Sequence, residues 1–212
     1  MKKIIAAVAA MFIVIFCLTA FDQPDNKYLV LVNKTHKLHQ DWGNRIYLVL
    51  ARNTYGEEYW IESETCRQYL ALREELLKQG IHIELDSAYR SAVAQQELWD
   101  WFTEKYGEEY AKTYAATPGY SEHQTGLAID IYLIKDGKKI RENDDMLAEK
   151  EIFAKIHELL PEYGFILRYP EGKEEVTGYA YEPWHLRYVG SPKTAKEITV
   201  AGFTLEEYLG VD

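Results

Sequence analysis

Apolar residues alternate with polar or small residues in several short stretches, which is the two-residue period of β-strands. The clearest is "GLAIDIYLI", residues 126–134. Its alternation predicts a core face of Leu127, Ile129, Ile131 and Leu133 and an opposite face of Ala128, Asp130 and Tyr132. Short strands or extended pieces are predicted in "KYLVLVNK" (27–34) and "RIYLVLA" (45–51). Further strands are predicted in "IHIELDSAYR" (81–90), "GFILRYP" (164–170) and "WHLRYVG" (184–190).

Other segments have the wider apolar spacing and the flanking residues of helices. The first is predicted from Ser63, as its N-cap, to about Gln79, with Gly80 as the stop. Its expected apolar side consists of Cys66, Tyr69, Leu70, Leu76 and Leu77. Further helices are predicted over about 93–106, 108–115 and 146–160, with a helical, peripheral tail over 191–210. Helices and strands do not alternate regularly, which favours an α+β domain with a small, largely antiparallel sheet flanked by helices.

The N-terminus has a different character from the rest of the chain. It begins "MKK" and continues as an unbroken apolar run, "IIAAVAAMFIVIFCLTAF", over residues 4–21. A short basic start before an apolar segment is typical of a secretory signal, and the run is also near the lower length limit of a membrane span. We therefore predict that residues 1–20 are a signal peptide or an N-terminal membrane anchor. The protein is then extracytoplasmic, secreted or anchored, and residues 25–212 form a single domain.

Composition narrows the class of partner. Hydrophobic residues make up 47% of the 212-residue chain, which is sufficient for one ordinary globular core. Basic and acidic side chains number 24 and 34, so the net charge of −10 argues against nucleic acid as the main partner.

Of the two cysteines, Cys17 lies in the predicted signal, and Cys66 is interpreted as a packed residue in the first turn of a helix. No internal disulfide is expected, and we expect the domain to be a monomer.

Two histidines and two acidic residues stand out from the apolar pattern. Asp130 interrupts a strand, and His123 precedes that strand at its entry. Glu182 and His185 are three residues apart across a turn with a proline. Two imidazoles and one carboxylate are a common set of three ligands for catalytic zinc, with a fourth position for water. A nearby carboxylate that does not bind the metal can accept the proton of that water, and Glu182 suits this role.

The same residues form a longer motif. "SEHQTGLAID" with "EPWH" downstream and "SAYRS" upstream resembles the VanY-type D-alanyl-D-alanine carboxypeptidases, whose pattern is S-x-H-x(6)-D followed by E-x-W-H. The likeness covers nearly the whole of the chain after the N-terminal segment. The residues that match the pattern are Ser121, His123, Asp130, Glu182, Trp184 and His185. The resemblance implies a zinc D,D-peptidase fold, which is similar to that of Hedgehog domains, and one Zn²⁺ per chain.

The resemblance also implies a role for each side chain. His123, Asp130 and His185 would bind the zinc, and Glu182 would be the general base. Arg90, in "SAYRS", would stabilise the negative charge on the scissile carbonyl oxygen. Substrate contacts are expected from Ser121, Gln96 and Trp184. Arg168 and Arg187 remain open between two roles, holding a terminal carboxylate of the substrate or forming structural ion pairs.

The activity implied is removal of the C-terminal D-alanine from peptidoglycan stem peptides, and the implied partner is such a stem peptide or its precursor. Two alternatives stay open: an L,D-carboxypeptidase that acts on tetrapeptide stems, and a non-catalytic wall-binding module of the same fold. The S-x-x-K and K-T-G motifs of the serine wall enzymes are absent from the sequence, which disfavours a serine mechanism. The remaining histidines, at positions 36, 39, 82 and 157, are interpreted as polar residues without a metal.

Overall fold

The computed structural model describes residues 26–211, which form a mixed helix and sheet structure. The N-terminal segment predicted to be a signal or an anchor, residues 1–20, lies outside these residues. Within 26–211, no helix combines the length and the apolar character needed to cross a membrane.

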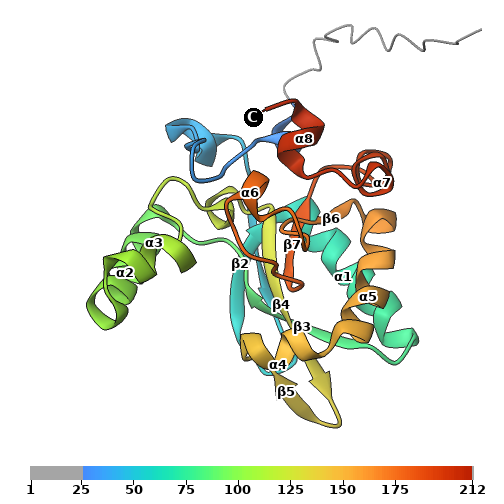
Figure 1. The fold of residues 1–212 in the computed structure, drawn as a ribbon. Helices are drawn as coiled ribbons and strands as arrows, with labels where there is room; N and C mark the ends of the chain where they lie inside the picture. The colour runs from blue at the N-terminus through green and yellow to red at the C-terminus, as the bar shows by residue number, and fades with distance from the viewer. Residues whose placement is uncertain (1–25, 212) are drawn as a thin grey trace, which may run out of the picture.

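A five-stranded antiparallel sheet occupies the centre of the molecule (Figure 1). Its strand order is β3 (His82–Ser87), β4 (Ala128–Lys135), β7 (His185–Tyr188) and β6 (Phe165–Leu167), and β5 (Lys138–Ile140) also pairs with β4. A separate antiparallel hairpin is formed by β1 (Leu48–Arg52) and β2 (Glu58–Glu62). The prediction of an α+β domain with a largely antiparallel sheet is therefore confirmed.

Helices cover the sheet. In Figure 1, α1 (Ser63–Lys78) and α5 (Lys150–Leu159) lie on one side of it, whereas α2 (Ala92–Tyr106) and α3 (Glu108–Tyr114) project on the other. The core between α1, α5 and the sheet buries Ile129, Ile131 and Leu133 of the predicted apolar face, together with Leu72, Leu76, Ile83, Phe153 and Ile156. The fourth residue of that face, Leu127, is buried in a separate cluster with Val32, Leu38 and Trp42. The shorter helices are α4 (Asn143–Ala148), α6 (Glu174–Thr177), α7 (Pro192–Ala201) and α8 (Leu205–Leu209). The described part of the chain also contains four 3₁₀ turns: η1 (Lys27–Leu29), η2 (Gln40–Asn44), η3 (Glu122–Thr125) and η4 (Leu160–Tyr163).

Of the two alternatives predicted for residues 27–34, a strand is not formed. Residues 27–34 form η1 followed by irregular backbone. The carbonyl oxygens of Tyr28 and Val30 accept hydrogen bonds of 3.0 and 2.7 Å from Arg187 Nη2. A buried arginine side chain thus satisfies backbone groups that a neighbouring strand would otherwise have to satisfy.

Helix α1 differs from its prediction at the N-cap and in its apolar face. Glu62, not Ser63, is the N-cap, and its carboxylate accepts hydrogen bonds from the backbone N–H groups of Glu64 and Thr65. Leu72 is fully buried, whereas Leu70 and Leu77 are 46% and 52% exposed. Because each residue turns the helix by about 100°, a shift of one or two positions is enough to move a leucine from the core to the surface.

Two further differences concern the C-terminal half. The helix predicted over 146–160 is divided into α4 and α5 at Glu149, whose backbone leaves the helical region at φ −88° and ψ 41°. The tail is helical as predicted, but it is not peripheral, because Ile198, Leu205 and Glu206 are buried. Glu206 binds Arg168 within the molecule, so α8 is connected to the sheet by a buried ion pair.

Candidate metal centre

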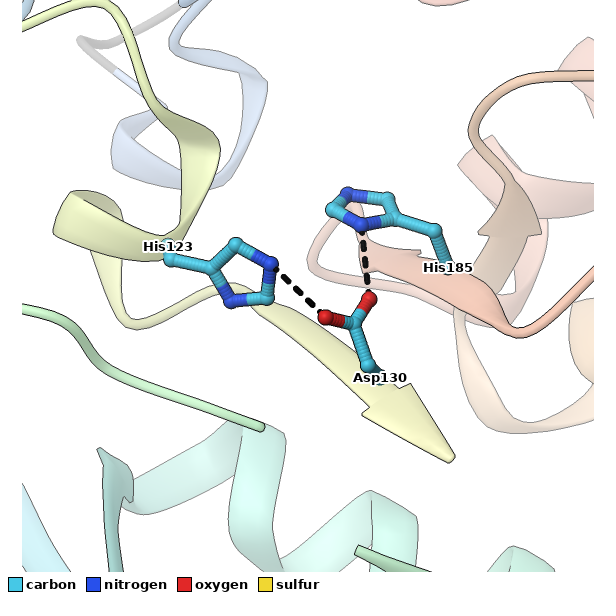
Figure 2. A group of neighbouring side chains, drawn as sticks. All are labelled: His123, Asp130 and His185. Atoms are coloured by element: carbon cyan, nitrogen blue, oxygen red, sulfur yellow. Dashed lines mark hydrogen bonds and ion pairs between the residues drawn. The ribbon is translucent and has the colours of Figure 1, made fainter. Parts of the chain in front are cut away.

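Two neighbouring strands and one 3₁₀ turn bring the predicted ligands together (Figure 2). Asp130 on β4 is the register partner of His185 on β7, so their side chains leave the sheet from adjacent positions. His123 lies on η3, which ends at Gly126 in the left-handed conformation, φ 71°. A Cβ atom at Gly126 would lie 3.3 Å from the backbone nitrogen of Glu62 and 3.1 Å from Leu48 Cδ2. Glycine therefore suits both the backbone conformation and the space at the turn that carries His123 beside β4.

The three side chains point at one another. His123 Nε2 lies 3.1 Å from Asp130 Oδ2, and His185 Nδ1 lies 2.9 Å from Asp130 Oδ1. One ligand atom from each residue lies within 4.8 Å of the others, which is compatible with a single ion at the centre. Among residues 26–211, this is the group of side chains that offers three such ligand atoms.

The hydrogen bonds also set the histidine tautomer. His123 Nδ1 lies 2.8 Å from the carbonyl oxygen of Ala88, which can only accept. His123 therefore has its proton on Nδ1 and presents the lone pair of Nε2 to the site. This fixed donor, the adjacent carboxylate and the second imidazole fit a divalent cation that prefers nitrogen and oxygen ligands.

The charges of the site are strongly coupled. Burial disfavours the charged form of Asp130, but the two imidazoles outweigh it and hold the pKa of this carboxyl well below its usual range. Burial likewise lowers the pKa of His185, yet the charge of Asp130 and its hydrogen bond raise that pKa to about 9. The pKa of His123 is lowered because burial is the dominant effect there. In the absence of a metal, Asp130 is thus ionised and forms an ion pair with the protonated His185.

Glu182 is close to the three ligands. Its Oε2 lies 3.9 Å from His185 Nδ1, and 30% of its side chain is exposed. Burial from one side, with the nearby Asp130 charge, raises the pKa of Glu182 to about 7, although His185 opposes this. A carboxylate with a pKa near neutrality can both accept and return a proton.

Arg90 lines the same pocket of about 210 Å³ as these groups. Its guanidinium is half-buried and donates to Gln95 Oε1 and to Ser87 Oγ, each at 3.0 Å. Its backbone N–H donates to the carbonyl of His123 at 3.1 Å. The cation is therefore fixed in the pocket next to the predicted ligands.

Of the remaining predicted substrate contacts, two lie in the pocket and one does not. Ser121 and Trp184 are buried and line the pocket, whereas Gln96 does not. Gln96 is exposed on α2 and donates to Asp100 Oδ1 at 2.8 Å. Gln95 occupies the pocket position instead, buried between Arg90 and the carbonyl of Ala116. The prediction of Gln96 was therefore wrong by one residue along α2, a step that changes the direction of a side chain by about 100°.

A buried charge cluster that was not predicted from the sequence adjoins the pocket. It consists of Glu122, Arg168, Arg187 and Glu206, none of which is more than 2% exposed. Both arginines bind Glu122 Oε1, at 2.8 Å from Arg168 Nε and 2.6 Å from Arg187 Nη1. Of the two roles left open for these arginines, the structure supports the structural ion pairs. The sequence signal was present, since two arginines interrupt otherwise apolar strands and Glu122 stands beside His123.

Within residues 26–211, none of the other histidines belongs to the metal group. His82 Nε2 lies 2.8 Å from Glu84 Oε1. His157 Nε2 donates to the carbonyl of Pro183 at 2.9 Å.

Comparisons with known proteins agree with this geometry. A family model described as VanY, D-alanyl-D-alanine carboxypeptidase, matches residues 58–191. A bifunctional D-Ala-D-Ala dipeptidase and D-Ala-D-Ala carboxypeptidase, VanXYC of Enterococcus gallinarum, is 40% identical over 188 residues, which cover 85% of this chain and 92% of the relative.

Two solved structures are similar throughout. A mutant of the D,D-pentapeptidase VanY in complex with Zn(II) is 31% identical, with a TM-score of 0.70 and coverage of 86% of this chain and 99% of the other. The LD-carboxypeptidase LdcB is 35% identical, with a TM-score of 0.74 and coverage of 89% of both chains. With the fold, the ligand geometry and the sequence match in agreement, the chain belongs to the VanY D-alanyl-D-alanine carboxypeptidase family.

Proposed function

We propose that this protein is a zinc-dependent D-alanyl-D-alanine carboxypeptidase that removes the terminal D-alanine from peptidoglycan stem peptides, with one zinc per chain. The convergence of His123, Asp130 and His185 beside Glu182 is the observation that carries the proposal. A related VanY structure is a Zn(II) complex, which supports zinc as the metal. His123, Asp130 and His185 would hold it.

The residues around the site have distinct tasks in the proposed hydrolysis. When bound, zinc acts as a Lewis acid and lowers the pKa of water to about 7. Glu182 accepts the proton of the attacking water and returns it to the amine of the leaving D-alanine. Arg90 stabilises the negative charge that develops on the scissile carbonyl oxygen. Ser121 and Trp184 line the pocket and contact the peptide beside the scissile bond.

Arg90 gives a direct test of the charge stabilisation. Replacing it with alanine is expected to lower kcat/KM by about 10²–10³-fold, the usual effect of removing one oxyanion donor. The affinity for zinc should change little, because Arg90 is not among the three ligands. Steady-state kinetics of D-alanine release would measure the effect. Arg52→Ala serves as the control, since Arg52 forms an exposed ion pair with Glu58 on the separate hairpin. Equal kcat/KM in Arg90→Ala and the parent would contradict the role.

The D,D activity is placed before the L,D alternative because both the family model and VanXYC carry the D-Ala-D-Ala name. The likeness to LdcB favours the L,D activity as the second candidate. A pentapeptide stem ends in the D,D bond, and a tetrapeptide stem ends in the L,D bond. The two substrates therefore separate the candidates.

We expect purified protein to release D-alanine from the pentapeptide stem, to lose this activity with a chelator and to regain it with added zinc. Chromatographic assay of D-alanine, with metal analysis of the same sample, would measure both. Release from the tetrapeptide alone would replace the first candidate with the second. Binding of stem peptides without any release by zinc-loaded protein would favour the non-catalytic wall-binding module.

The proposed substrate also sets the proposed location. Stem peptides of the wall lie outside the cell membrane, and the apolar N-terminal segment would export the domain or anchor it there. Fractionation of cells that express the full chain would test this, and recovery of the protein in the cytoplasm alone would contradict it.

A further inference from the structure

A buried carboxylate lies directly behind the metal ligand His185. Glu122 Oε2 is 3.5 Å from His185 Nε2, on the side of the ring away from Asp130. Both atoms are buried, and neither has a hydrogen-bond partner within the described part of the chain. Two unsatisfied polar atoms that face each other at this distance form a good hydrogen bond after a shift of about 0.5 Å.

Glu122 is held rigidly in this position. Its other oxygen, Oε1, binds Arg168 Nε and Arg187 Nη1. Arg168 and Arg187 are completely buried, and the carboxylate of Glu206 binds Arg168 from its other side. Because Oε1 carries both arginine contacts, Oε2 remains available to the imidazole.

The chemistry of His185 requires such an acceptor. His185 presents Nδ1 to Asp130 and to the site, so a cation there would be bound through Nδ1. An imidazole that gives its Nδ1 lone pair to a metal has its proton on Nε2. Around His185 Nε2, Glu122 Oε2 is the carboxylate oxygen that can accept this proton. His123 has the corresponding arrangement on its other nitrogen, where the carbonyl of Ala88 accepts from Nδ1.

We propose that Glu122 is a positioning residue for the metal: it holds His185 in the tautomer and orientation that leave Nδ1 free to bind the ion. This inference rests on the proposed function for the identity of the ion as zinc. The ring of Tyr169, 4.6 Å from that of His185 between centroids, restricts the imidazole from one face. Carboxylates that fix a metal-bound histidine in this way change metal affinity by about 10–100-fold.

Glu122→Gln tests the proposal because glutamine is close to glutamate in shape but replaces one accepting oxygen with a donating N–H₂ group. If the amide oxygen keeps the arginine contacts, the amide N–H₂ faces His185 Nε2. That donor favours a lone pair on Nε2 and therefore a proton on Nδ1, which blocks the metal position. We expect the zinc dissociation constant, measured by competition with a chelating dye, to rise about 10–100-fold.

Glu84→Gln is the matched control for a purely structural role. Glu84 is also a buried acid in ion pairs, with Arg73 at 2.6 Å and His82 at 2.8 Å, and it is not part of the metal group. This variant should be destabilised but should bind zinc like the parent. Zinc affinity of Glu122→Gln equal to that of the parent and of Glu84→Gln would overturn the positioning role.

A second measurement uses only the parent protein, so it does not depend on whether a variant folds. Long-range ¹H–¹⁵N NMR of the zinc-loaded parent identifies the protonated nitrogen of each histidine, and we expect Nε2–H for His185. A proton on Nδ1 would overturn the proposal. Failure of the proposed function is distinguishable: zinc-loaded parent that releases no D-alanine refutes the activity, whereas the dye competition and the tautomer still decide the role of Glu122.

Discussion

Replacing Glu182 with glutamine is expected to lower D-alanine release by about 10²–10⁴-fold, the range for loss of a general acid–base group. Glutamine has nearly the same shape but cannot accept the proton of the attacking water at neutral pH. Glu182 is not one of the three ligands, and its carboxylate lies 3.9 Å from His185 Nδ1. Zinc content should therefore remain that of the parent, and kinetics with metal analysis of one preparation would measure both properties.

Two further variants serve as controls for the effect of Glu182→Gln. Glu175→Gln changes an exposed acid on α6, in the segment before Glu182, and should behave like the parent. His123→Ala removes a ligand and should lose zinc together with activity. Parent-like turnover by Glu182→Gln would refute the assigned mechanism, and loss of zinc from the same variant would show that Glu182 helps to hold the metal.

The parts of the site that could be predicted from sequence are those with a local signal. Alternation within residues 126–134 placed Asp130 opposite the core face, and the structure buries Ile129, Ile131 and Leu133 as expected. Residue types alone suggested His123, Asp130 and His185 as a zinc ligand set, and the resemblance assigned them to one site, although 55 residues separate Asp130 from His185. No local pattern states which strands pair, and the register that joins these two residues is a property of the whole sheet.

The buried charges show where prediction from sequence ends. Charged residues are expected at the surface, and they are buried only when partners satisfy them. The partners of Arg168 are 46 and 38 residues away, at Glu122 and Glu206. Similarly, the apolar pattern of residues 27–34 allowed a strand, whereas the carbonyl oxygens of Tyr28 and Val30 accept hydrogen bonds from the side chain of Arg187. Both outcomes follow from long-range contacts that single-sequence periodicity does not contain.

The same cluster leads to the largest expected effect on stability. Glu206→Gln is expected to lower the free energy of unfolding by about 3–5 kcal/mol at neutral pH, the cost of removing one partner from a buried ion pair. Glu206 accepts from Arg168 Nη1 at 2.8 Å and from Nη2 at 2.6 Å, and also from Asn33 Nδ2 at 3.1 Å. An amide in its place directs a donor at the guanidinium. Denaturant unfolding of both proteins would measure the difference.

The pH dependence of that difference identifies its origin. Burial alone would raise the pKa of Glu206, but its hydrogen bonds and the charge of Arg168 lower it below the ordinary value. A lowered pKa in the folded state contributes stability above the unfolded-state pKa, about 4.3, and this contribution is lost as the pH falls through the folded-state pKa. The gap between parent and Glu206→Gln should therefore be constant near neutrality and narrow below about pH 4. Glu162→Gln, which breaks an exposed ion pair with Lys196, should cost at most about 1 kcal/mol. A gap that stayed unchanged down to acid pH would show that packing of α8, rather than the charge on Glu206, connects this helix to the sheet.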